Sequence, residues 1–540
     1  MKKRKLPALA GTIVLAATLC SCTNIFNEGN NEIKVFTGYF AINGEAIDEN
    51  NDIKEIIAKK TGAKCDEVWK SANKSVDETI DDMIISRRYP DFIYGGVGQQ
   101  KLLDADALIP INEYWDEYEN IKNYFTADQW EKLEDENGYI HYIPVYSNNY
   151  MNNTDPEYSD EAFWIQVKVL EWAGYPQINT LNQYFELIEN YLKENPVNED
   201  GEKYIGYEIL TDDYLYFCME NPPQFLDGYP NDGGCIVDPD TLTALDYNTT
   251  PTAQKWFRKL NEEYHRGIID PEFSFMTSAQ YYEKIKSGLV LGMVDQHWNF
   301  DAAESELPAD SQYVPLDLVI SEDIVPHYKS ADSFDTSQGL GISVDCEDVE
   351  SALKFIDDLL SPEIMTLRFW GVEGQDYIED ESGKFYRNDA QRSRSFSTDY
   401  QKEHFCSYSG FPFYGGMSLD GINAYCPENQ PDEYFNTLGG PMKRCLEAYG
   451  VKTVSELLNA DSENPPWFPV WTYTNRFTDD TDYGRAKQSI DSVKHRYLPK
   501  VIMSSDFDAA WDEYMDAYKL CDTGSYFNEL TAEVRRRCGK

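Results

Sequence analysis

Short apolar runs alternate along this chain with longer segments whose apolar residues recur every three to four positions. The apolar runs predict strands at residues 31–40, 90–96, 289–294, 313–320 and 340–344. Helical periodicity predicts helices at residues 50–63, 161–174, 180–196, 278–288, 349–360, 361–371 and 506–537. Alternation of this kind is typical of α/β layers, so we expect a fold of that class.

Several of these elements carry residues that mark their ends. Thr180 and Gln183 have the spacing of a capping box at the start of the clearest helix. Gly62 should end the helix at 50–63, and the long C-terminal helical segment should break near Gly524. The dipeptide that begins at Asn137 predicts a hairpin over residues 137–146.

The first residues have the pattern of an export signal. A basic head at Lys2–Lys5 precedes an apolar stretch at 6–19, which is too short for a membrane-spanning helix of about 20 residues. The residues Leu19-Cys20-Ser21 before Cys22 resemble the bacterial lipobox. That resemblance implies a signal peptide at 1–21, lipid attachment to Cys22, and a polar tether at 22–31. A plain secretory peptide is the alternative.

Charge and aromatic content narrow the partners. With 540 residues the chain is long enough for two or more compact units. Its formal charge of -48 makes nucleic acid and anionic lipid unsuitable partners. Aromatic residues make up 14% of the chain, and their flat apolar faces with polar edges suit sugar rings as well as a core.

The cysteines and the histidines indicate no metal or catalytic centre. Eleven cysteines are present, and nine remain after Cys20 and Cys22 are set aside, an odd number with no C-x-x-C pair. Buried free thiols are therefore expected for most of them, and we predict no metal and no cofactor. The chain has no phosphate-loop, G-x-S-x-G or H-E-x-x-H motif, although a glycosidase with paired carboxylates stays open.

Five phrases in order carry a resemblance to a known family. They are "RRYPDFIY" (87–94), "ENGYIHYIPV" (136–145), "VLEWAGYPQINTLNQYFELIENYL" (169–192), "KIKSGLVLGMVDQHW" (284–298) and "LLSPEIMTLRFWGVEGQDY" (359–377). Together they are similar to extracellular solute-binding proteins of family 1, in the long lipoprotein branch that serves ABC importers of Gram-positive bacteria. The chain departs from this branch at its "W-x-R-x-D-W-L" motif, where it keeps Trp164 but has Gln166, Lys168 and Leu170.

The resemblance implies a hinged α/β receptor with two lobes, a periplasmic-binding-protein-like fold of type II. We expect residues 32–147 plus 321–385 to form lobe 1 and residues 148–320 plus 386–540 to form lobe 2. The chain would cross between the lobes more than once.

Candidate ligand residues follow from the rule that ligands of open α/β sheets bind beyond the carboxyl ends of strands. The residues that follow the predicted strands, together with the tryptophan of the family motif, are Tyr39, Tyr94, Gln99, Tyr146, Tyr150, Trp164, Asp295, His297 and Trp298. They supply rings, amides and one acid, which is the chemistry that the hydroxyl rim of a sugar requires.

The resemblance therefore implies a lipid-anchored receptor on the outer face of the cell membrane. It would be a monomer that captures a carbohydrate, in particular an oligosaccharide, and delivers it to ABC permease subunits without catalysing a reaction. Three alternatives remain open: an exported glycan-active enzyme, a peptide receptor of the same architecture, and a surface interaction module without a small ligand.

Overall fold

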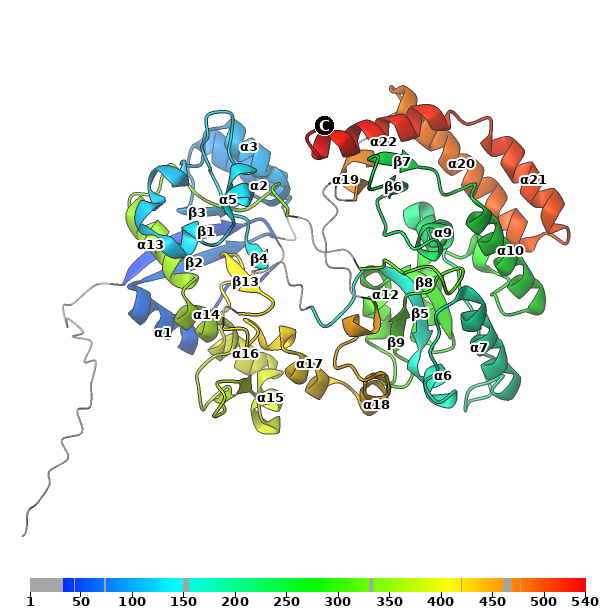
Figure 1. Cartoon of the computed structure of the whole chain (residues 1–540). Helices are drawn as coiled ribbons and strands as arrows, with labels where there is room; N and C mark the ends of the chain where they lie inside the picture. Colours follow the sequence, from blue (N-terminus) through cyan, green and yellow to red (C-terminus); the bar gives the residue numbers. More distant parts are fainter. Residues whose placement is uncertain are drawn as a thin grey trace, which may run out of the picture.

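The computed structural model describes residues 33–42, 44–71, 74–148, 155–329, 334–418, 420–459, 467, 469–475 and 477–540. Within these ranges the chain forms two α/β lobes, one on each side of Figure 1. The predicted signal peptide, Cys22 and the tether lie outside the described residues. None of the described helices has the length and apolar character that a membrane crossing requires.

Lobe 1 is built on a sheet of four strands in the order β10-β3-β1-β2. Strand β1 (Lys34–Phe40) runs parallel to β2 (Ala63–Trp69) and to β3 (Phe92–Tyr94), whereas β10 (Leu340–Ile342) is antiparallel to β3. Alternate residues of β1 enter separate cores on the two faces of the sheet: Phe36 lies in one core and Tyr39 in the other. The strands predicted at 31–40, 90–96 and 340–344 are confirmed.

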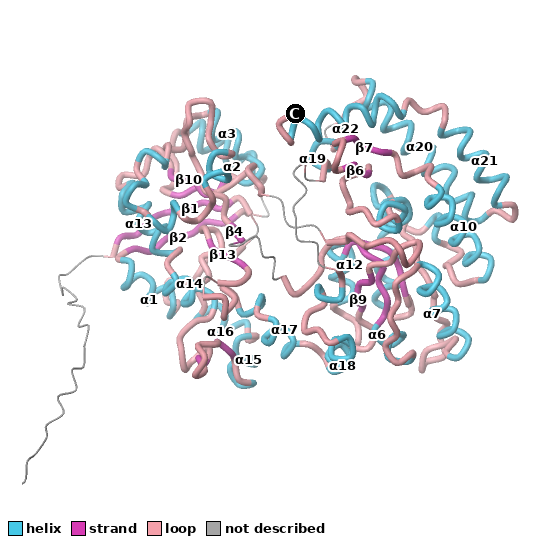
Figure 2. The backbone as a smooth tube through the Cα atoms, in the orientation of Figure 1, coloured by secondary structure: helices cyan, strands magenta, loops and turns pink. Residues whose placement is uncertain are grey.

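Helices cover both faces of this sheet (Figure 2). They are α1 (Asp52–Thr61), α2 (Val76–Ser86), α3 (Gln99–Asp104), α13 (Val349–Leu359) and α14 (Pro362–Phe369). Helix α1 ends at Gly62, whose φ of 75° is the left-handed conformation that glycine adopts without strain. Proline at the first turn of α14 agrees with its predicted start.

Lobe 2 contains a sheet of three antiparallel strands in the order β8-β5-β9. Its strands are β5 (Glu161–Gln166), β8 (Gly292–Gln296) and β9 (Tyr313–Leu316). The single helix predicted at 161–174 is wrong, because its first six residues form β5 and only α6 (Val167–Trp172) is helical. All six residues of β5 are buried, and such a run has no periodicity that distinguishes a strand from a helix.

Helices make up most of the rest of lobe 2. The main ones are α7 (Leu181–Glu194), α10 (Pro251–Arg266), α11 (Ser278–Lys286), α12 (His297–Glu304), α20 (Asp482–Met503), α21 (Phe507–Tyr518) and α22 (Thr523–Arg537). The capping box of Thr180 and Gln183 is present at α7. The C-terminal segment breaks between α21 and α22, and Gly524 lies inside the first turn of α22.

Shorter elements complete the two lobes. The short helices include α4 (Glu119–Lys122), α5 (Ala127–Glu131), α8 (Phe217–Glu220), α9 (Pro222–Leu226), α15 (Asp389–Ser395), α16 (Thr398–His404), α17 (Pro431–Thr437), α18 (Gly440–Tyr449) and α19 (Trp471–Thr474). Two hairpins pair β6 (Ile236–Asp238) with β7 (Thr243–Leu245) and β11 (Ile378–Glu379) with β12 (Phe385–Tyr386).

The predicted hairpin at 137–146 is wrong. Strand β4 (Tyr146–Asn148) instead pairs in parallel with β13 (Phe413–Gly415), and Ile143 forms a bridge with Leu340. The residues after the Asn-Gly turn therefore run along lobe 1 and pair with β13 and Leu340, which are distant in sequence. A local turn signal does not reveal such pairing.

The residues that form each lobe differ from the predicted ranges. Cys406, Phe411 and Tyr414 lie in the core of lobe 1, although residues 386–540 were predicted for lobe 2. Tyr328 packs in the core of lobe 2, although residues 321–385 were predicted for lobe 1. Successive described segments thus alternate between the lobes, and α17 lies between them at the bottom of Figure 1.

A buried arginine attaches residues 407–412 to lobe 1. Arg368 of α14 is 1% exposed, and its guanidinium donates hydrogen bonds to the backbone carbonyls of Leu359, Ser407, Tyr408, Phe411 and Pro412. Burial lowers the pKa of Arg368 to about 10, so the group stays charged at neutral pH. The carbonyl oxygens take the place of water around the cation.

The nine cysteines of the described chain form no disulfide. Eight of them are buried, and Cys538 is partly exposed. Burial raises the pKa of those thiols for which a shift is resolved, including Cys65 and Cys218, so they remain protonated. The prediction of buried free thiols is confirmed for these residues.

A buried histidine joins α16 to α1 and to the segment after α14. The two ring nitrogens of His404 lie 3.0 Å from Asp52 Oδ2 and 2.8 Å from Asp376 Oδ2. Burial on its own would lower the pKa of His404, but the bonds to Asp376 and Asp52 outweigh it and raise that pKa above 6.5. The charged form of the ring therefore stabilises the folded state.

We expect His404→Gln to lower the free energy of unfolding by about 2 kcal/mol at pH 5.5, the scale of hydrogen bonds between charged groups. Because folding raises the pKa of His404, its stabilisation is complete below the unfolded value near 6.5 and is lost as pH rises through the folded value. The free energies of unfolding of the variant and the wild type, measured by urea titration, should therefore become equal as the pH approaches 9. His265→Gln, at an exposed histidine, is the control; an equal cost of His404→Gln at both pH values would contradict the assignment.

Candidate functional site

A pocket of about 380 Å³ opens in lobe 1 beyond the carboxyl ends of β1 and β3. Its aromatic lining is Tyr94, Phe125, Tyr146, Phe334 and Phe413, and its polar lining is Gln129, Ser147, Asp335, Gln338 and Ser409. Figure 1 shows β4 and β13, which contribute part of this wall, on the side of lobe 1 turned toward lobe 2. The combination of rings and hydrogen-bonding groups fits a ligand with apolar faces and a hydroxyl rim.

Tyr146 presents the most exposed ring of this wall. Its side chain is 43% exposed and packs edge-on against Phe413, with ring centroids 5.8 Å apart. A Cβ on Gly415 would come within 2.4 Å of the Tyr146 ring, so glycine at that position lets the ring lie across β13. Tyr94 is only 7% exposed, and burial together with the charge of Asp335 raises the pKa of its hydroxyl.

Gln99 lies behind this wall as a support. It is 2% exposed, and its Oε1 accepts hydrogen bonds from the backbone N–H of Gly95 at 3.1 Å and of Gly339 at 3.5 Å. The amide thus ties the loop after β3 to the start of β10. Gln99 positions the strand end that carries Tyr94.

Lobe 2 holds a small cavity of about 70 Å³ beside the junction of β8 and α12. It is lined by Tyr158, Asp160, Glu161, Phe225, Asn231, Gln296, Tyr328, Pro469 and Trp471. Glu161 is 1% exposed; its Oε2 accepts hydrogen bonds from Asn221 and Asn231, whereas its Oε1 has no partner among the described residues. Burial raises the pKa of Glu161 well above its usual range.

Trp298 offers an accessible ring next to this cavity. It lies in the first turn of α12, directly after β8, and is 46% exposed. Its indole N–H donates to Gln296 Oε1, and its ring lies 6.4 Å from that of Phe217. Helix α12 is on the side of lobe 2 that faces lobe 1 in Figure 1. Trp298 is therefore placed as the strand-end rule predicts.

Three other predicted ligand residues lie beneath Trp298 instead of beside it. Asp295 is fully buried and accepts hydrogen bonds from Tyr281 at 2.7 Å and from Asn299 at 3.0 Å. Trp164 is 1% exposed and donates to the Asp295 carbonyl at 2.8 Å, and His297 stacks on its ring at 5.1 Å. Burial raises the pKa of Asp295 to about 6. These side chains support the junction of β8 and α12.

The remaining predictions have different outcomes. Tyr39 is 4% exposed and packs with Ile80 in the core on one face of the lobe 1 sheet. Side chains alternate between the two faces along β1, so Tyr39 points into this core and not toward the pocket. Tyr150 lies outside the described residues. Phe413 was missed because residues 386–540 were assigned to lobe 2; the aromatic and glycine-rich run "FPFYGG" at 411–416 was the available signal.

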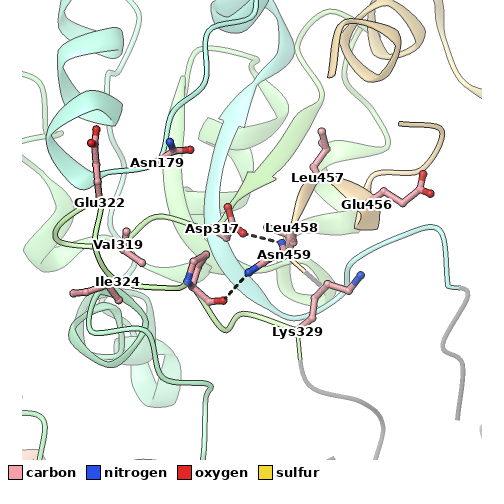
Figure 3. A pocket seen from close by; sticks show the side chains of 11 residues that line it. Asn179, Asp317, Val319, Glu322, Ile324, Lys329, Glu456, Leu457, Leu458 and Asn459 are labelled. Atoms are coloured by element: carbon pink, nitrogen blue, oxygen red, sulfur yellow. Dashed lines mark hydrogen bonds between the residues drawn. The ribbon is translucent and has the colours of Figure 1, made fainter. Parts of the chain in front are cut away.

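Two further cavities have a different chemistry. One of about 610 Å³ lies between residues 317–329 and 456–459 of lobe 2 and has no aromatic lining (Figure 3). In it, Asn459 donates from its backbone N–H to Asp317 at 2.7 Å. The other, of about 680 Å³, is lined by Arg368, Arg387 and Arg392. This second cavity also has rings in its lining, Phe369, Phe396, Phe405 and Tyr434, and it takes residues from both lobes.

The described residues contain no cluster of three or more His, Cys, Asp or Glu side chains arranged to hold a metal ion.

Comparison with known proteins finds similarity only at the level of structure. No family model and no curated protein matches the sequence. A solute-binding protein from Bifidobacterium longum infantis, described as HMO-binding and associated with an ABC transporter, matches with a TM-score of 0.58 at 12% identity, over 93% of this chain and 98% of that one. An extracellular solute-binding protein from Bifidobacterium longum subsp. infantis gives 0.58 at 13% identity, over 93% and 98%.

A third match comes from S. pneumoniae. The ABC-transporter substrate-binding protein FusA, as an EF-hand mutant in complex with fructo-nystose, matches with a TM-score of 0.57 at 14% identity, over 94% of this chain and 100% of that one. These likenesses extend over nearly the full length of all three structures. The chain therefore has the two-lobed α/β fold of the extracellular solute-binding proteins of ABC transporters.

Proposed function

We propose that this protein is a receptor that captures a carbohydrate between its lobes and delivers it to an ABC permease. The observation that carries the proposal is an exposed aromatic ring on each lobe: Tyr146, beside Phe413, on lobe 1 and Trp298 on lobe 2, on elements that lie on the facing sides of the lobes in Figure 1. Exposed rings with amides and carboxylates beside them suit the faces and the hydroxyl rim of a sugar. Structural neighbours described as HMO-binding, or as complexes with fructo-nystose and kestose, support this substrate class.

The mechanism is closure of the lobes around the ligand, with no bond made or broken. Each wall is supported inside its own lobe, so the lobes can move while the walls keep their shape. The site residues of the proposal are Trp298, Tyr94 and Tyr146 as ligand contacts, with Tyr150 as a further predicted contact. Asp295, His297, Trp164 and Gln99 act as supports. The protein would function as a monomer.

An exported glycan-active enzyme and a peptide receptor are the alternatives. For a hydrolase, two carboxyl groups would have to flank a bound glycosidic bond at about 5–10 Å from each other. For a peptide receptor, backbone donors and acceptors would be expected to line the cleft in place of rings. The aromatic walls favour the carbohydrate.

The first test is a thermal-shift screen of the purified protein against neutral and acidic glycans and against peptides. A ligand present at 100 times its dissociation constant stabilises the fold by about 2.7 kcal/mol, so a carbohydrate should raise the melting temperature and peptides should not. Reducing ends should stay constant during the incubation. A stabilising peptide, or reducing ends that grow in proportion to protein, would refute the proposal.

The second prediction distinguishes the role of Trp298 in ligand binding from the role of the buried Trp164 in stability. We expect Trp298→Ala to weaken sugar binding by about 10- to 100-fold, because stacking on an aromatic ring is worth about 1–3 kcal/mol, and to change the melting temperature little. Trp164→Ala should instead cost about 3–5 kcal/mol of stability, because it empties a core position. Calorimetric titration measures the affinity of each variant, and thermal melting measures its stability. Phe275→Ala, at a ring that is 71% exposed and outside both cleft pockets, is the control.

The same two measurements decide the outcome for Trp298. A large loss of stability with unchanged affinity in the folded fraction would show that Trp298 is a core residue.

The proposal also includes a lipid anchor on Cys22 at the outer face of the cell membrane. We expect Cys22→Ser to abolish lipid labelling and signal processing and to release the protein from membranes, because a diacyl anchor gives the stable attachment that one chain does not. Cys20→Ser is the matched control, since Cys20 would leave with the signal peptide. Lipid labelling that survives Cys22→Ser, or that is lost only with Cys20→Ser, would refute the assignment.

A further inference from the structure

The pocket of lobe 1 and the small cavity of lobe 2 have no basic residue in their described lining. The pocket of lobe 1 contains one acid, Asp335, and the cavity of lobe 2 contains two, Asp160 and Glu161, but neither contains Lys or Arg among the described residues. Two other cavities do contain cations: Lys329 lines one, and three arginines line the other, which has walls from both lobes. The lobe 1 pocket and the lobe 2 cavity therefore differ in charge from these two cavities.

This lining distinguishes ligands by charge. A carboxylate that enters the cleft loses water and finds no cation to replace it, which is costly for a charged group. A hydroxyl loses less, and it can donate to the carboxylates that are present. The exposed carboxylate Asp335 also repels an anion as it approaches the lobe 1 pocket, and this repulsion is strongest at low ionic strength.

Asp335 is the carboxylate best placed to act in this way. It is exposed at the pocket, where its Oδ1 accepts a hydrogen bond from the backbone N–H of Ser337 at 2.8 Å. Besides the effect of burial, its charge raises the pKa of the hydroxyls of Tyr94 and Tyr142. The field of Asp335 thus reaches the aromatic wall on which a sugar would lie.

Glu161 contributes from the opposite lobe. Its Oε2 is fixed by the amides of Asn221 and Asn231, and its Oε1 has no hydrogen-bond partner among the described residues. An unpartnered oxygen in a buried carboxyl group is costly, and a hydroxyl of a ligand at the cavity would satisfy it. Because burial raises its pKa, Glu161 acts here as a hydrogen-bonding group and not as a repelling charge.

We propose that the pocket of lobe 1 selects uncharged glycans and rejects acidic ones such as uronic-acid or sialylated oligosaccharides, with Asp335 as a determinant of that selectivity. This inference rests on the proposed carbohydrate function. It adds a substrate class to this pocket, because its described lining accepts hydroxyl donors and supplies no cation for a carboxylate.

The test uses pairs of oligosaccharides, one neutral and one that carries carboxylates. Mannopentaose is compared with the mannuronate pentamer, galactopentaose with the galacturonate pentamer, and lacto-N-tetraose with its sialylated form, by calorimetric titration at low and at physiological salt. We expect the neutral member of at least one pair to bind, and its acidic partner to bind about 30-fold more weakly or worse at low salt. The difference should narrow as salt is added.

Two substitutions test whether Asp335 causes the preference for the neutral member of a pair. Asp335→Asn should reduce the preference for the neutral member at least about threefold at low salt, because it removes one repelling charge while keeping the shape of the side chain. Asp116→Asn in lobe 1 makes the same change at a side chain that is 96% exposed and outside the pocket, and it should leave the preference unchanged. Melting temperatures of both variants verify that the fold is intact.

Each outcome has a distinct meaning. An acidic member that binds as tightly as its neutral partner overturns the inference and leaves the carbohydrate receptor in place. A preference that Asp335→Asn does not alter overturns the role of Asp335. If no glycan of any pair binds, the proposed function itself fails.

Discussion

The position of one wall of the cleft depends on the buried guanidinium of Arg368. A cation removed from water needs compensation, and here five backbone carbonyls provide it without any carboxylate. Four of those carbonyls belong to residues 407–412, so the bonds fix a segment that would otherwise have little secondary structure. This segment leads directly into β13, and it brings Ser409 and Phe413 to the pocket of lobe 1. A single internal charge thereby determines which lobe supplies these side chains.

Lobe 2 uses the same principle with a buried acid. Asp295 receives hydrogen bonds from Tyr281, Asn299 and the thiol of Cys218, which hold the end of β8 where α12 begins. Trp298 stands in the first turn of that helix, so its orientation follows from bonds made below the surface. Both walls therefore rest on buried polar groups with nearly complete hydrogen bonding. Such networks favour one arrangement, because breaking one bond leaves a costly unpaired group.

The sequence predicted these parts unequally, and the reasons are physical. Local signals were sufficient where they act locally, as with the left-handed stop at Gly62 and the capping box at Thr180. The strand-end rule predicted Tyr146 and Trp298, which have exposed rings, but it could not show that Asp295 is buried, because the rule places strand ends and not side-chain faces. The family motif likewise did not show that Trp164 is buried. The lobe assignment of 386–415 required the contact of Arg368 with carbonyls about 40 residues away, which no local pattern encodes.

Two walls that belong to different lobes also constrain how a ligand can act. A ligand shifts an equilibrium between open and closed forms only by the difference between its affinities for them. A sugar that contacts Tyr146 and Phe413 alone makes those contacts in either form, so it would bind without favouring closure. A sugar that reaches Trp298 as well gains contacts that exist only when the lobes approach each other. In the proposed mechanism, stacking on Trp298 would therefore be the term that couples binding to closure, and an oligosaccharide would span both lobes more readily than a single ring.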